Sequence, residues 1–92
     1  MMAAVKKGDH KFYIGDDEQN PEAEITFDTS DEGHIIITHT KVSEELRGQG
    51  VAGKLVDEVV KFARREEKKI KPACSYAKNK MERTPEYRDI LV

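Results

Sequence analysis

Alternating apolar and polar residues form the first clear pattern along the chain, from Ala23 to Asp28. This segment reads Ala-Glu-Ile-Thr-Phe-Asp, which is typical of a strand that buries one face and exposes the other. A shorter β-prone run, Lys11–Ile14, precedes it, and the polar, turn-rich residues 15–21 separate the two. We therefore predict two antiparallel strands in the first third of the chain.

The segment from His34 to Val42 is the strongest strand candidate. It contains three consecutive isoleucines, Ile35-Ile36-Ile37, and it follows a turn at Asp31-Glu32-Gly33. An unbroken β-branched run is typical of a strand that is covered on both faces. We therefore expect residues 34–42 to form a central strand of the sheet.

Beyond Gly50 the hydrophobic period changes from two residues to between three and four. The apolar positions are Val51, Ala52, Leu55, Val56, Val59, Phe62 and Ala63. Charged residues occupy the opposite face, which predicts an amphipathic helix of roughly five turns. Ser43 and the two glutamates after it suit a helix start, but Gly48 and Gly50 interrupt any helix there and move the start to about Gly50.

Two shorter segments complete the pattern. Lys69–Cys74 is short and alternating enough to be a strand, although Pro72 fits an edge or a bulge better than a central position. Because it follows a strand and a helix, it should lie parallel to residues 34–42 through a right-handed crossover. Thr84-Pro85-Glu86-Tyr87 has a capping residue and a proline at the first helical position, which predicts a short closing helix to Ile90 or Leu91.

The composition limits the classes of protein to consider. The chain has 92 residues, 37% of them hydrophobic, which is enough for one α+β domain over residues 1–92 and too little for two. No apolar run approaches the roughly 18 residues that cross a membrane, and no secretory signal is recognisable, so we expect a cytoplasmic protein. Sixteen basic residues are interspersed with eighteen acidic ones, which does not favour a nucleic-acid partner. One cysteine and three scattered histidines have no metal-binding spacing.

The segment between the best strand and the best helix carries the clearest chemistry. Residues 42–53 read Val-Ser-Glu-Glu-Leu-Arg-Gly-Gln-Gly-Val-Ala-Gly. Glycines at 48 and 50 leave backbone N–H groups unobstructed at the amino end of a helix, where the helix dipole favours an anion. Arg47 adds a fixed charge, and Lys54 is placed to reach a second phosphate. The turn predicts a phosphate site, while a tight connection whose glycines only relieve crowding is the alternative.

The spacing Arg-x-x-Gly-x-Ala from Arg47 to Ala52 makes the interpretation more specific. Preceded by a β-branched strand and followed by an amphipathic helix, it closely resembles the acetyl-CoA signature of the GNAT superfamily of N-acetyltransferases. It matches neither the dinucleotide-binding Gly-x-Gly-x-x-Gly pattern nor a nucleotide triphosphate loop. The resemblance covers about residues 23–76. Residues 38–42, 72–76 and 85–87 are further similar to the short GNAT-like proteins of bacteria.

The resemblance implies a minimal α+β GNAT-like fold with acetyl-CoA as the donor. In that fold, antiparallel strands lead into a central strand, a glycine-rich turn, an amphipathic helix, a parallel splayed strand and a short C-terminal helix. Backbone amides of residues 49–53 would hold the CoA pyrophosphate, in a site formed by Arg47, Gly48, Gln49, Gly50, Val51, Ala52, Gly53 and Lys54. The pantetheine arm would lie between the strands 37–42 and 70–74 and pair with the backbone near Thr40 and Val42. The thioester would then lie at the carboxyl end of strand 70–74.

Acetyl transfer to an amine needs a neutral amine, a path for its proton and a proton donor for the departing thiolate. The resemblance implies a tyrosine beyond the splayed strand as the acid. Tyr76 is the nearest candidate, and Tyr87 is a distant second. Cys74 is a second candidate, either as a donor to the thiolate or as an acceptor of the acetyl group, and His39 is the candidate base. For each of these residues a purely structural role is the alternative interpretation.

The function implied is an acetyl-CoA-dependent N-acetyltransferase acting on a primary amine of a small molecule or a protein. A non-catalytic module that binds acetyl-CoA or CoA is the alternative, because the chain has no room for the extra helices and strands that shape the acceptor pocket of full-length members. A structural domain whose glycine turn binds nothing is the third interpretation.

Overall fold

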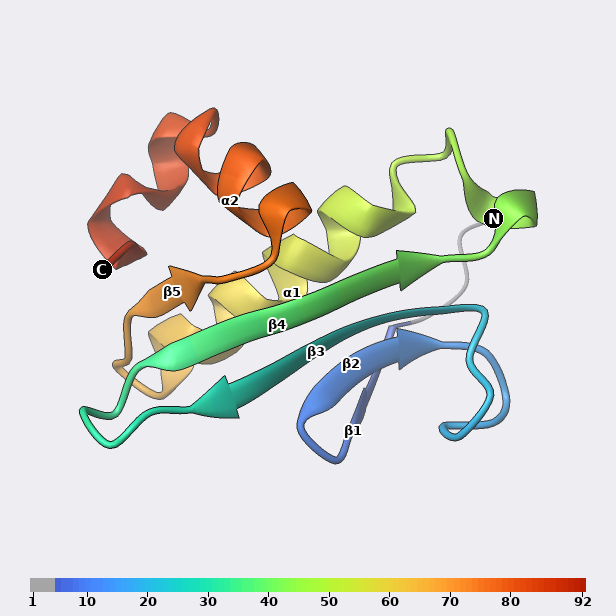
Figure 1. Ribbon diagram of the computed structural model, residues 1–92, viewed down its shortest axis with the longest axis horizontal. Coiled ribbons are helices and arrows are strands. Elements are labelled where there is room, and N and C mark those ends of the chain that lie inside the picture. Colours follow the sequence, from blue (N-terminus) through green and yellow to red (C-terminus); the bar gives the residue numbers. More distant parts are fainter. Residues whose placement is uncertain (1–4) are drawn as a thin grey trace.

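One five-stranded mixed sheet and the helices packed against it make up the protein (Figure 1). The structure is a computed structural model and describes residues 5–92. The elements in chain order are β1 (Lys6–Gly8), β2 (Lys11–Ile14), β3 (Ala23–Thr29), β4 (Ile35–Val42), the 3₁₀ turn η1 (Glu44–Leu46), α1 (Val51–Arg65), β5 (Ile70–Pro72), α2 (Ser75–Glu82) and the 3₁₀ helix η2 (Pro85–Ile90). No helix of these described residues is both long and apolar enough to cross a membrane.

The strands lie in the sheet in chain order. β1 to β4 pair as antiparallel neighbours, and β5 pairs parallel to β4 from Ile35↔Ile70 to Ile37↔Pro72. The four predicted strands and the parallel pairing of the last with residues 34–42 are thus confirmed, although β5 is shorter than predicted. β1 was not predicted, because three exposed or half-buried residues reading Lys-Lys-Gly leave no hydrophobic pattern to detect.

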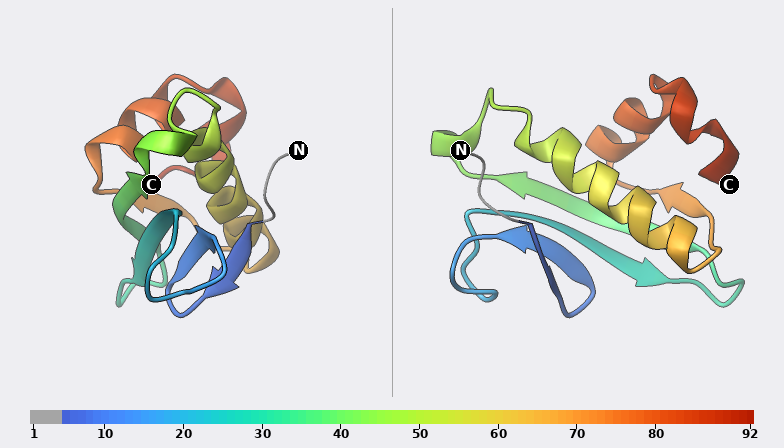
Figure 2. Two further views of the ribbon diagram at one scale, coloured as in Figure 1. Left: turned by 90° about the vertical axis from the view of Figure 1, so that its right-hand side faces the viewer. Right: turned by 180° about the vertical axis from the view of Figure 1, so that it is seen from behind.

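Helix α1 crosses the face of the sheet that holds the core, and the sheet curves around it (Figure 2). α2 and η2 pack against β5 and α1 at one end. The apolar stripe of α1 buries Val51, Leu55, Val56, Val59, Val60 and Ala63, and this burial, together with Ile25, Ile35 and Ile37 from the sheet, forms one hydrophobic core. The helix has 15 residues, about four turns rather than the five expected.

The interpretation of β4 as covered on both faces is wrong. Ile35 and Ile37 are buried on the helix side, whereas Ile36 between them is only half-buried, because no element of residues 5–92 packs over that side of β4. β5 also pairs with only the first three residues of β4. The triple isoleucine therefore marks one buried face and one partly exposed residue.

A β-bulge interrupts the pairing of β3 with β4. Phe27 pairs with Ile37 and Thr26 with His39, which leaves Thr38 as the extra residue. The Thr38 hydroxyl donates to the Thr26 carbonyl oxygen at 3.2 Å. Because a bulge shifts the side-chain alternation by one residue, positions 40 and 42 turn to the helix side, where they pair with the buried residues 25 and 23.

The last third of the chain differs most from expectation. The strand predicted to reach Cys74 ends at Pro72, and the unpredicted helix α2 begins at Ser75. α2 buries only Ala77 and Met81, too few apolar positions for its period to be recognised. The closing helix has the predicted extent but is 3₁₀, and the Thr84 hydroxyl donates to the Lys80 carbonyl oxygen (2.7 Å) instead of capping it.

Replacing neighbouring isoleucines tests the one-sided burial of β4. Ile37 is fully buried, so Ile37→Ala should lower the free energy of unfolding by about 2–5 kcal/mol. The matched variant Ile36→Ala, on the uncovered side, should lower it by about 1 kcal/mol or less. Chemical denaturation of the two variants measures the difference, and equal losses would show that both faces of β4 are covered.

Candidate functional site

A cleft opens where β4 and β5 separate. The N–H groups of Ala73 and Cys74 both donate to the carbonyl oxygen of Ile37, at 2.9 and 3.0 Å, and the parallel pairing ends there. Beyond this point, within residues 5–92, the β5-side edge of β4 has no strand partner. Two joined hollows of about 220 and 540 Å³ follow this edge, and both are lined by Val42, Arg47, Ala52 and Tyr76.

The glycine turn forms one end of the cleft. Gly48 (φ 82°) and Gly50 (φ 74°) have left-handed backbone conformations that favour glycine. Among residues 5–92, the backbone N–H groups of residues 48–53 have no hydrogen-bond acceptor, and the first bond of α1 is Lys54 N–H to Gly50 O at 3.1 Å. No side chain caps this helix and its first turn holds no acid. The result is a row of free donors at a positive helix end, an arrangement that suits an anion.

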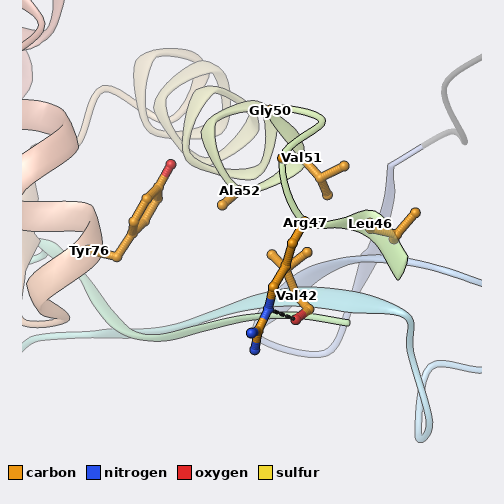
Figure 3. Close-up of a pocket in the computed structure, with 8 residues that line it drawn as sticks. Val42, Leu46, Arg47, Gly50, Val51, Ala52 and Tyr76 are labelled. Carbon is orange, nitrogen blue, oxygen red and sulfur yellow. Dashed lines mark hydrogen bonds between the residues drawn. The ribbon is translucent and has the colours of Figure 1, made fainter. Parts of the chain in front are cut away.

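Arg47 lies in the cleft but not against the free N–H groups. Its Nε donates to the carbonyl oxygen of Val42 at 3.3 Å, and Figure 3 shows the side chain running from the turn toward β4, away from Gly50. Arg47 therefore occupies the backbone group that the pantetheine arm was expected to use. Gln49 stabilises the turn, because its side-chain amide donates a hydrogen bond to the Glu45 carbonyl oxygen at 3.0 Å. Lys54 is half-buried on α1 and does not line either hollow.

Thr40 and Cys74, 34 positions apart in sequence, meet across the separation of the strands. The Cys74 thiol donates to the Thr40 hydroxyl oxygen, with Sγ and Oγ1 3.5 Å apart. Burial raises the pKa of this thiol, but the Thr40 hydroxyl and the backbone of Ala77 and Tyr76 lower it, and the net pKa is below the ordinary value. Cys74 stands at the N-cap of α2 without a capping hydrogen bond, so those backbone groups act on the thiolate as oriented dipoles.

Tyr76 projects from α2 across the cleft toward α1 (Figure 3). Its side chain is 41% exposed and lines both hollows. Burial and the negative charge of a Cys74 thiolate raise the pKa of its hydroxyl, which is therefore protonated at neutral pH. Tyr87 lies elsewhere: its hydroxyl donates to Asp57 Oδ1 at 3.2 Å, and burial and that carboxylate raise its pKa to about 12. Tyr87 therefore does not line the cleft.

His39 borders the larger hollow but lies on the other face of β4 from Thr40. It follows the bulge, pairs with Thr26 and is exposed. The structure thus brings Thr40, Val42, Cys74 and Tyr76 together with the turn, whereas the His39 side chain belongs to the uncovered face. No group of three or more His, Cys, Asp or Glu side chains within residues 5–92 is placed to hold a metal ion.

Lys80 is a residue of this region that the sequence did not suggest. A Cβ built on Gly53 would stand 3.5 Å from Lys80 Nζ and 3.8 Å from the Tyr76 hydroxyl oxygen, so both side chains lie against the first turn of α1. Tyr76, Lys80 and Arg83 share a third hollow of about 510 Å³ with Asn79 and Thr84. Recognising α2 as a helix would have placed these residues on one face.

Comparisons with known proteins agree with this architecture. The family model for GCN5-related N-acetyl-transferases matches residues 11–90. The NMR solution structure of a GCN5-like protein from Staphylococcus aureus, assigned as an N-acetyltransferase, superposes with a TM-score of 0.84 at 48% sequence identity and covers 98% of this chain and 88% of that chain. None of the curated proteins compared with the chain matches it. The chain belongs to the GCN5-related N-acetyltransferase family.

Proposed function

We propose that the protein binds acetyl-CoA in the cleft and transfers the acetyl group to a primary amine. The observation that carries the proposal is the row of free N–H groups at residues 48–53, at the end of a cleft that leads to Thr40 and Cys74. The bound thioester supplies an acetyl group that is activated toward an amine nucleophile.

The turn supplies the anion site. Backbone N–H groups of residues 49–53 donate to the pyrophosphate, and the amino end of α1 adds its positive dipole. Arg47 contributes when its side chain leaves the Val42 carbonyl oxygen, where a single hydrogen bond of 3.3 Å holds an exposed guanidinium. This movement also frees that carbonyl for the amide of the pantetheine arm.

The unpaired edge of β4 positions the thioester end of acetyl-CoA. The bulge presents Thr40 and Val42 to the cleft, where extended backbone offers N–H and C=O groups to the pantetheine arm as a neighbouring strand would. The arm then leads from the turn to Thr40, Cys74 and Tyr76.

The protonated Tyr76 hydroxyl is the acid of the transfer. The carbon–nitrogen bond forms as the carbon–sulfur bond breaks, Tyr76 gives its proton to the leaving sulfur, and the nitrogen loses one proton. The residues that line the two cleft hollows include no Asp or Glu, so that proton passes to water or to His39 at the rim. Cys74 either stabilises the leaving group or takes the acetyl group on Sγ before the amine does.

A module that binds acetyl-CoA without catalysis is the second candidate. It is favoured by the absence of carboxylates from the cleft lining and by the position of His39 on the other face of β4. In that case the donor site works as proposed, but no base accepts the amine proton.

Gly50→Val tests the donor site. A side chain in this left-handed turn disturbs the N–H groups, so affinity for acetyl-CoA should fall more than tenfold, since each lost charge-assisted hydrogen bond costs about 1.5–3 kcal/mol. NMR amide shifts of residues 48–53 during titration provide the measurement. The control is Gly33→Val, which has the same backbone constraint (φ 83° and no neighbour within 4 Å) in the turn before β4 and should bind normally. Wild-type amides that do not shift would refute the donor site.

Tyr76→Phe tests catalysis. Removal of the acid should slow thiol release from acetyl-CoA with an amine acceptor by about a hundredfold while leaving affinity for acetyl-CoA unchanged. Tyr13→Phe, on the half-buried face of β2, is the control and should have the wild-type rate. Thiol release that no amine stimulates in the wild type would instead favour the binding module. An acetyl group on Cys74, detected by intact mass, would establish the covalent route.

Thr40→Val tests the environment of Cys74. The Thr40 hydroxyl can rotate to donate to Sγ once the thiol has lost its proton, and this favours the thiolate. Loss of the hydroxyl should therefore raise the thiol pKa and shift the pH profile of iodoacetamide alkylation to higher pH. The wild-type midpoint should lie below the ordinary thiol value. Thr29→Val, at the exposed end of β3, serves as the control. An unchanged profile in Thr40→Val would show that this contact does not act on the thiol.

A further inference from the structure

We propose that the third hollow, on α2, binds the 3′-phosphate of coenzyme A and lets the protein discriminate coenzyme A from 3′-dephospho-coenzyme A. The proposal rests on the proposed function, because it takes the pyrophosphate to lie on the free N–H groups of residues 48–53. Coenzyme A carries a third phosphate on the ribose that adjoins the pyrophosphate. A ligand held at the turn therefore brings a second anionic group close to it.

The third hollow, called the α2 hollow below, lies along one face of helix α2. Tyr76, Asn79, Lys80 and Arg83 recur at intervals of three and four residues, and Thr84 completes the lining. Its volume of about 510 Å³ is larger than a phosphate group needs and leaves room for part of the ribose. Tyr76 lines both this hollow and the cleft, so the two adjoin each other.

Lys80 connects the hollow to the phosphate turn. Its Nζ and Cε lie 3.5 and 3.4 Å from the point where a Cβ on Gly53 would stand. Gly53 is the third residue of α1, among the residues whose N–H groups have no acceptor within residues 5–92. The ammonium group therefore lies beside the proposed pyrophosphate site, on the side that faces α2. These distances are ordinary van der Waals contacts, so the lysine side chain packs directly against this turn of α1.

The charges in the hollow favour a doubly charged anion. None of its lining residues is Asp or Glu, and neither Lys80 nor Arg83 forms a salt bridge within residues 5–92. Within residues 5–92 only Lys11, Lys61 and Arg64 among the lysines and arginines pair with carboxylates, so what distinguishes Lys80 and Arg83 is that both line one hollow. A phosphate monoester carries nearly two charges at neutral pH, whereas each pyrophosphate group carries one. Two unpaired cations therefore suit the 3′-phosphate best.

Comparison of two ligands by isothermal titration calorimetry tests the assignment. The wild type should bind coenzyme A about tenfold more tightly than 3′-dephospho-coenzyme A, as expected for charge-assisted hydrogen bonds. Lys80→Gln and Arg83→Gln should each lose most of this preference while binding the dephosphorylated ligand with nearly wild-type affinity. Lys78→Gln is the matched control, because Lys78 is exposed on α2 but does not line the hollow, and it should retain the preference.

Three results would overturn the assignment in different ways. Equal wild-type affinities for the two ligands would refute the 3′-phosphate site and leave the proposed donor site intact. Equal losses for both ligands in Lys80→Gln would assign the lysine to the pyrophosphate instead. Failure of both ligands to bind the wild type would refute the proposed function itself, and with it the inference.

Discussion

The end of the parallel pairing at Ile37 is the constraint on which the rest of the site depends. One carbonyl oxygen accepts the N–H groups of Ala73 and Cys74, and the chain then turns into α2 instead of continuing along β4. Pro72, just before this point, has no N–H group to extend the ladder. The bulge at Thr38 lies at the same level and turns Thr40 and Val42 inward. The same position in the sheet thus opens the cleft, turns residues 40 and 42 of β4 toward it and brings the Cys74 thiol to Thr40.

In α1, the residues that stabilise the helix and the N–H groups that are free for a ligand lie in different places. A serine or aspartate cap would stabilise α1 by about 1 kcal/mol, but its oxygen would occupy N–H groups that are free here. The helix instead starts from an uncapped glycine and a first turn without acids. Its stability comes from the buried stripe that begins at Val51 and continues through Leu55 to Ala63. The face that packs and the end whose N–H groups are free are therefore separate, so that end is open to the proposed anion.

Sequence patterns predicted the parts of the fold where the hydrophobic period is long and strong. β3 alternates buried and half-buried residues from Ala23 to Phe27, β4 begins with an unbroken run of isoleucines, and α1 has a buried stripe along its whole length. The glycine turn was predicted because it joins β4 to α1. α2 was missed because its eight residues bury only Ala77 and Met81, and Lys80 was missed with it. The bulge at Thr38 was missed because no glycine or proline marks it. Without the bulge, the face of β4 on which His39 lies could not be predicted, because that face depends on the pairing of β4 with β3 rather than on the local sequence.

The electrostatics of the cleft favour an anionic ligand, such as the proposed acetyl-CoA, over a cationic amine. The side chains that line the cleft and the α2 hollow are basic, apolar, amide or hydroxyl groups, with no carboxylate among them, although the whole chain has a net charge of −2. Acidic side chains pair elsewhere, as Glu24 does with Lys11 and Asp89 with Arg64. Such a lining attracts phosphates and repels an ammonium ion. In the proposed transfer, an amine acceptor would therefore have to reach the thioester in its neutral form, or from the uncovered face of β4 where His39 and Thr38 lie.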